Sequence, residues 1–169
     1  LNSGTIQDGA GNNAILTLAA PGETNSLAAS ADIQIDAQAP TILSVSSTTE
    51  NGYYNAGDLI PIIVSFSETI NVVNPITLSQ IVNITLETGE NDIAINYASG
   101  TGTSNLTFNY IVSAGHTSND LDYISTNALT LNNSTITDIA GNAAVVTLPA
   151  PGETNSLGAN KAIVIDTES

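Results

Sequence analysis

The sequence repeats a long phrase of itself after 130 residues. Residues 1–39 align without gaps on residues 131–169, and 23 of these 39 positions are identical. Repetition at a fixed spacing is typical of tandem arrays, in which each copy is one structural unit. We therefore expect residues 40–169 to form one complete repeat of about 130 residues, and residues 1–39 to be the C-terminal strands of a preceding repeat. Because an isolated hairpin is marginal in water, we expect residues 1–39 to pack on the start of the complete repeat or on a neighbouring chain.

Alternating apolar and polar residues predict short strands throughout the complete repeat. The alternation places Ile60, Ile62, Val64 and Phe66 on one face of the clearest strand. We predict strands at residues 41–46, 58–68, 76–87 (with a bulge near Gln80), 92–98, 106–113, 128–131, 135–137, 143–148 and 161–166. The sequence Asn51-Gly52 is read as a turn, and no segment of helical length keeps a 3.6-residue period. Many short strands with one apolar face predict an all-β fold, a two-sheet β-sandwich, with a closed barrel as the alternative.

The charge is strongly acidic. Sixteen Asp and Glu residues stand against one Lys and no Arg, giving a net charge of −15. This charge repels phosphate backbones and anionic lipid surfaces, so we expect neither nucleic-acid binding nor direct membrane insertion. The same charge attracts cations, although solubility alone is an equally simple explanation for it. The sequence has no Cys, which excludes disulfides and thiolate ligands.

Several stretches, in this order, resemble the bacterial immunoglobulin-like repeats of very large surface proteins and adhesins, often called cadherin-like. They are GDLIPIIVSFSE, ASGTGTSNLTFNY, DLDY, DIAGNAA and KAIVIDT. The resemblance implies an immunoglobulin-like sandwich that is extracellular, lies at the bacterial cell surface and is not an enzyme. It also implies a stalk or spacer module whose partners are adjacent repeats of the same chain, with Ca²⁺ at the junctions.

In an immunoglobulin-type sandwich, acidic residues from distant segments would meet where the chain enters the repeat. Glu68 follows Phe66 in phase at the end of its predicted strand, Asp138 and Asn142 lie in the last loop, and Asp36 lies in the linker. Oxygen ligands of this kind suit Ca²⁺, which tolerates irregular geometry. The alternative for Asp138 is that it only caps a tight turn before Gly141-Asn142.

A second acidic group is expected at the opposite end of the repeat. It consists of Asp120 and Asp122, two residues apart and therefore on one side of an extended chain, with Glu50 and Asp166. Two carboxylates so close repel each other unless a cation lies between them. The alternative is that Asp120 is an ordinary loop acid.

Enzymatic chemistry finds little support in this sequence. His116 is the only His, lies in a polar loop where we expect it to be solvated, and no nucleophile-elbow motif accompanies it. We therefore expect a calcium-binding spacer module of an extracellular bacterial adhesin. Two rivals remain open: a module whose loop at residues 149–161 or 99–105 binds a glycan or another cell-surface receptor, and a subunit of a filament or surface layer.

Overall fold

The computed structural model describes residues 3–74 and 81–167. The chain divides into two compact units, Leu1–Asp36 and Ala37–Ser169. The predicted bulge near Gln80 lies outside the described residues. Among residues 3–36, the structure has one short helix, α1 (Leu27–Ser30), and an isolated bridge between Gln7 and Asn13.

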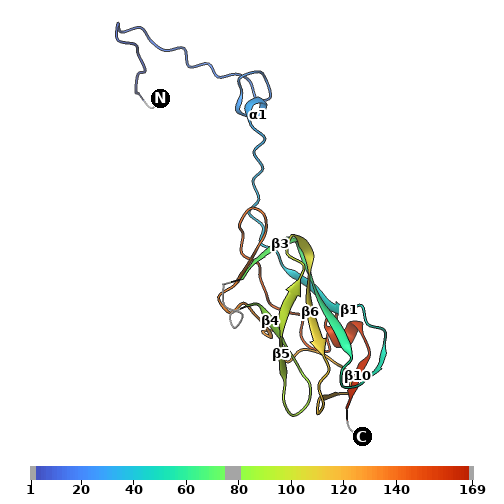
Figure 1. Ribbon diagram of the computed structural model, residues 1–169. Coiled ribbons are helices and arrows are strands. Elements are labelled where there is room, and N and C mark those ends of the chain that lie inside the picture. Colours follow the sequence, from blue (N-terminus) through green and yellow to red (C-terminus); the bar gives the residue numbers. More distant parts are fainter. Residues whose placement is uncertain (1–2, 75–80, 168–169) are drawn as a thin grey trace. The chain divides into compact units, whose positions relative to one another are not determined.

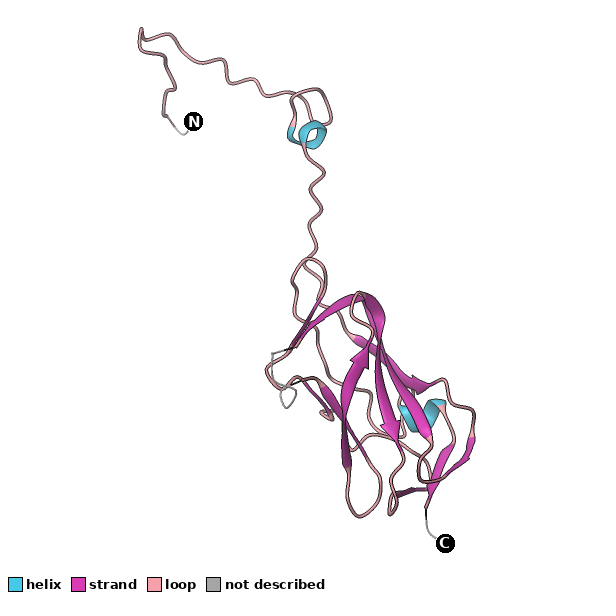
Figure 2. Ribbon diagram, viewed as in Figure 1, coloured by secondary structure: helices cyan, strands magenta, loops and turns pink. Residues whose placement is uncertain are grey.

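The second unit has an all-β fold with curled, mostly antiparallel sheets (Figures 1 and 2). Its larger sheet has the strand order β1-β3-β6-β5-β4-β8, and β9 pairs with the far end of β3. These strands are β1 (Ile42–Ser47), β3 (Leu59–Val73), β4 (Asn83–Leu86), β5 (Ile93–Ser99), β6 (Thr103–Ile111), β8 (Leu129–Thr130) and β9 (Thr135–Thr137). A smaller sheet has the order β2-β10-β7, formed by β2 (Gly52–Tyr54), β10 (Ile163–Asp166) and β7 (Thr117–Ser118). The pairing of β10 with β2 is parallel, and the other pairings between named strands are antiparallel.

The core follows the alternation in the sequence. Ile60, Ile62, Val64 and Phe66 of β3 are all buried, as predicted. On the neighbouring strand β6 and just beyond it, the alternate residues Leu106, Phe108, Tyr110 and Val112 are buried too. Ile62 pairs with Phe108 across the two strands. Each strand therefore contributes one apolar face to a common core, and its other face is polar or partly exposed.

Two predicted strands differ from the observed ones for identifiable reasons. The strand predicted at 58–68 continues to Val73, because its register against β6 shifts between Ser65 and Ile70 and its last residues pair with β9 instead. The prediction of a strand at 143–148 is wrong, since that segment forms only isolated bridges at Ala143 and Val145. Val145 bonds to the carbonyl oxygen of Pro40, and a proline has no N–H with which to extend a ladder.

Besides α1, three small elements of the second unit were missed by sequence reasoning. Gly52, read as part of a turn, begins β2, whose partner β10 lies about 110 residues further along the chain. The two-residue strand β7 also pairs with β10. The helix α2 (Leu157–Asn160) lies within the polar loop 149–161; the side chain of Ser156 caps it by accepting a bond from the Ala159 N–H at 3.1 Å.

Candidate metal centre

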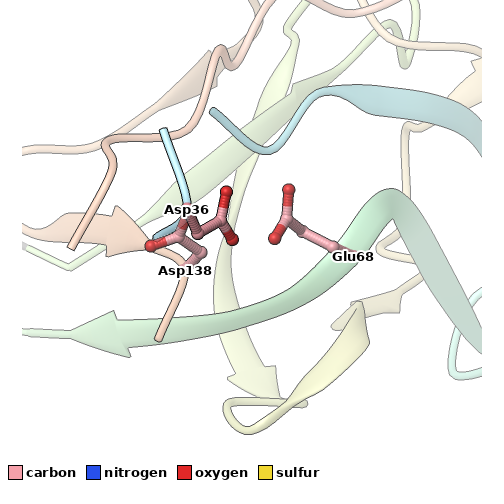
Figure 3. A group of neighbouring side chains, drawn as sticks. All are labelled: Asp36, Glu68 and Asp138. Atoms are coloured by element: carbon pink, nitrogen blue, oxygen red, sulfur yellow. The ribbon is translucent and has the colours of Figure 1, made fainter. Parts of the chain in front are cut away.

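Three carboxylates from distant parts of the sequence come together. Asp36, Glu68 and Asp138 each offer one oxygen, and these oxygens all lie within 4.8 Å of one another. In Figure 3 the carboxylate of Glu68 points toward those of Asp36 and Asp138. Asp36 is exposed, Glu68 is half-buried and Asp138 is buried. All three belong to the set that the sequence predicted to meet where the chain enters the repeat.

Glu68 owes its position to an irregularity in β3. Four residues of β3 lie between Ser65 and Ile70, while only one residue of β6 lies between their partners Asn105 and Thr103. The extra residues of β3 form a bulge, and Glu68 lies within it. A bulge of this kind bends a strand and redirects its side chains, so Glu68 is half-buried here although the strand continues beyond it.

The chain just after Asp36 is fixed by hydrogen bonds on two sides. The Thr41 N–H donates to the Ser67 hydroxyl at 3.0 Å, and the Ser67 N–H donates to the Thr41 carbonyl at 2.8 Å. On the other side, the Val145 N–H donates to the Pro40 carbonyl at 2.8 Å. Residues 40 and 41 are therefore held between the bulge that carries Glu68 and the segment that follows Asp138.

Asp138 closes a tight turn with Asn142. Its Oδ1 accepts the Asn142 N–H at 2.8 Å, and its Oδ2 accepts the Asn142 side-chain amide at 2.7 Å. Burial raises the pKa of Asp138, but the hydrogen bonds from Asn142, Gly141 and Ala140 outweigh this effect and hold the pKa below its ordinary value. Asp138 is therefore ionised at neutral pH, as a metal ligand must be.

The turn-capping role of Asp138 is thus real, and it is compatible with metal binding. Each carboxylate oxygen has two lone pairs, so an oxygen that accepts one hydrogen bond can still face a cation. Asn142, predicted as a fourth ligand, directs its amide NH₂ to Asp138. The first unit contains the same turn, in which Oδ1 and Oδ2 of Asp8 accept the main-chain and side-chain N–H groups of Asn12, each at 2.8 Å.

In the second predicted acidic group, which is Glu50, Asp120, Asp122 and Asp166, only Asp120 and Asp122 are seen beside a common glycine in the described part of the chain. Asp120 and Asp122 both lie beside Gly158, since a Cβ atom on Gly158 would be 3.3 Å from Oδ2 of Asp120 and 3.0 Å from Oδ2 of Asp122. Desolvation raises the pKa of Asp120, and the charge of Asp122 raises it further. The Asp122 side chain holds the loop at Gly152, because its Oδ2 accepts the Gly152 N–H at 2.9 Å.

Neither Glu50 nor Asp166 completes a group of three carboxylates with this pair within the described residues. The Glu50 carbonyl accepts the Tyr54 hydroxyl at 2.7 Å, and Asp166 ends β10 opposite Thr117. Across residues 3–74 and 81–167, Asp36, Glu68 and Asp138 form the one group of three acidic or His side chains close enough to share an ion. A second ion held by Glu50, Asp120, Asp122 and Asp166 stays a prediction.

His116, expected to be solvated, is half-buried against an aromatic ring. Its imidazole stacks on Tyr110, with ring centroids 5.8 Å apart, and its Nδ1 shares a 2.9 Å hydrogen bond with the Tyr110 hydroxyl. Burial raises the pKa of Tyr110 to about 12. The hydrogen bond gives the buried Tyr110 hydroxyl a partner, so His116 contributes to packing at this position.

Comparison with family models, with curated proteins and with solved structures found no match to this chain. In the described part of the chain, there is no helix with the length and apolar character that a membrane crossing requires.

Proposed function

We propose that this chain is a calcium-binding spacer module of an extracellular bacterial surface protein. The observation that carries the proposal is the meeting of Asp36, Glu68 and Asp138 within 4.8 Å. The three ligands come from the linker, from the bulge of β3 and from the turn after β9. An ion held by all three would bind the linker to the body of the repeat.

Calcium is the cation that this group favours. Carboxylate oxygens are hard ligands, and Ca²⁺ accepts six to eight oxygens in irregular geometry, whereas Mg²⁺ requires a near-ideal octahedron. The three carboxylates would supply part of that shell, and main-chain carbonyls and water would supply the rest. The net charge of −15 also favours a divalent cation. Lys161, the only Lys or Arg, donates to the Thr49 carbonyl at 2.8 Å.

The proposed module is an immunoglobulin-like two-sheet sandwich. The separate sheet β2-β10-β7 supports two sheets over a single closed barrel. We further propose that adjacent repeats of the same chain are its first partners, because the 130-residue repetition is typical of an array. In loop 149–161, the glycan site of the rival proposal, Leu157 is buried and Asn160 donates to the Val45 carbonyl, while residues 150–155 are exposed.

Melting with and without calcium tests the proposal. Extracellular calcium modules have dissociation constants of about 10⁻⁴ to 10⁻³ M. At about one hundred times that constant, a single site adds about 2.7 kcal/mol to the free energy of unfolding. We expect the melting temperature in excess Ca²⁺ to exceed that in EDTA by several degrees.

Two matched variants test whether the calcium-dependent rise in melting temperature comes from the proposed site. Glu68→Gln removes one negative charge from the proposed site at constant size and should abolish most of the calcium-dependent rise. Glu90→Gln makes the same change at an exposed loop position and should retain the rise. Identical melting curves for the wild-type chain in Ca²⁺ and in EDTA would refute the proposed function.

A further inference from the structure

The first unit has the local structure of the C-terminal segment of the second unit. The turn at Asp8–Asn12 matches the turn at Asp138–Asn142, and helix α1 matches α2, each capped by a serine. Asn25 and Asn155 adopt the same left-handed conformation, with φ of 71° and 73°. These features lie 130 residues apart in every case. The turn and the short capped helix therefore form in the first unit through local interactions, without the sheet that surrounds their counterparts.

The two segments differ in what covers their apolar side chains. Leu18, Leu27 and Ile35 are 89%, 71% and 92% exposed, while their counterparts Leu148, Leu157 and Ile165 are 2%, 0% and 2% exposed. Ile6 and Ile33 are likewise exposed, and their counterparts Ile136 and Ile163 are buried. In the first unit, Leu18, Leu27, Ile33 and Ile35 line an open apolar hollow.

The second unit indicates what fills such a hollow. There α2 packs against β1, the Val45 N–H donates to the Asn155 carbonyl at 2.9 Å, and β10 pairs with β2. A β-sheet body like that of the second unit, presenting a strand like β1, therefore matches the hollow. A second copy of the chain also has such a body, but there the docking surface is already occupied by that copy's own C-terminal segment.

Of the differences between the two segments at this contact, three change a side-chain hydrogen bond or a close packing distance. Asn160 and Lys161 donate to the carbonyls of Val45 and Thr49 at 2.7 and 2.8 Å, but their counterparts in the first unit are Ser30 and Ala31. Gly158 has Ala28 as its counterpart, and a Cβ atom at Gly158 would be 3.0 Å from Oδ2 of Asp122, which is tighter than ordinary contact. On the body of a second copy, residues 1–36 would lose two side-chain hydrogen bonds and gain a steric conflict.

We propose that residues 1–36 are a docking segment for a β-sheet body of this kind, and that Gly158, Asn160 and Lys161 keep it off the body of a second copy. Similar repeats in one array risk exchanging strands with each other, which is a known route to misassembly of repeat proteins. Three residues at the contact give each body a preference for its own C-terminal segment. The preference needs no change in the apolar residues that line the hollow and have identical, buried counterparts in the second unit, which are Leu18, Leu27, Ile33 and Ile35.

Exchanging these three residues between the two segments tests the proposal. The exchanged chain carries Ala28→Gly, Ser30→Asn and Ala31→Lys together with Gly158→Ala, Asn160→Ser and Lys161→Ala, so its composition and net charge are those of the wild type. Docking is detected by a disulfide in this cysteine-free protein. One chain carries Gln34→Cys and the other Tyr53→Cys, because Val164, the counterpart of Gln34, pairs with Tyr53. The two chains are mixed in urea with EDTA, refolded together and mildly oxidised.

We expect the exchanged chains to form several-fold more of the two-chain disulfide than wild-type chains carrying the same cysteines. Adding Leu27→Asp to the exchanged chains should abolish the product, because Leu27 would be buried in the docked segment. Equal amounts of disulfide in exchanged and wild-type chains would overturn the proposal, as would its absence from the exchanged chains. Because EDTA is present throughout, the outcome is independent of calcium binding.

Discussion

Asp138 belongs to both the turn with Asn142 and the proposed metal site. Its oxygens close the turn by accepting hydrogen bonds from Asn142, and one of them also lies within 4.8 Å of the oxygens of Asp36 and Glu68. Sequence reasoning offered these two functions as alternatives. The geometry makes them compatible, since the hydrogen bonds fix the carboxylate in place and keep it ionised.

The lowered pKa of Asp138 predicts how the stability of the domain depends on pH. A carboxyl whose pKa is lower in the folded state stabilises the fold above its unfolded pKa, ordinarily 3.8, and this contribution disappears as the pH falls through the folded value. We expect Asp138→Asn to lower the urea midpoint at pH 7 in EDTA, and the difference from the wild type to shrink at pH 3.

Asp8→Asn is the matched control, because it removes the same turn cap from the first unit. It should leave the midpoint of the second unit unchanged at both pH values. A midpoint for Asp138→Asn that equals the wild type at pH 7 would contradict the role given to these hydrogen bonds.

At the level of elements, the sequence predicts the strands whose signal is local. Ile60, Ile62, Val64 and Phe66 alternate with less buried residues over a full strand, so their burial could be predicted without knowing the partner strand. The strand β2 carries no such signal in three residues and depends on β10, far along the chain. The bulge that positions Glu68 could not be predicted either, because it arises from a mismatch between two strands.

The convergence of Asp36, Glu68 and Asp138 was predictable for a different reason. Strand phase placed Glu68 near the edge of the core, and the order of strands in an assumed topology placed the last loop beside the incoming chain. The second acidic group depended on the orientation of single loops. There the sequence could not show that Asp122 accepts a hydrogen bond from Gly152.

Leu157 in α2 should contribute far more to stability than its counterpart in α1. It is fully buried, and replacing a buried Leu by Ala costs about 2–5 kcal/mol. We therefore expect Leu157→Ala to lower the free energy of unfolding by about 2–5 kcal/mol in urea titrations. Leu27→Ala changes the matching residue, which is 71% exposed, and should have almost no effect. Equal losses in the two variants would show that Leu27 is buried by a partner in solution.

For the whole molecule, the repetition and the carboxylate group bear on one question, which is how freely the linker moves. Asp36 directly precedes Ala37, the first residue of the second unit. An ion shared by Asp36, Glu68 and Asp138 would restrict that linker, and its removal would leave carboxylates that repel one another. A spacer needs such restriction, because an array whose linkers move freely does not keep a defined length.

The most direct test of this account is the spread of distances between the two units, measured with and without calcium. Spin labels attached to Thr24→Cys and Asn109→Cys, both exposed positions in a chain without other cysteines, report that spread by electron paramagnetic resonance. We predict that Ca²⁺ narrows the distance distribution relative to EDTA, that Glu68→Gln abolishes the narrowing, and that Glu90→Gln retains it. Distributions of equal width in Ca²⁺ and EDTA, or narrowing that persists in Glu68→Gln, would contradict the account.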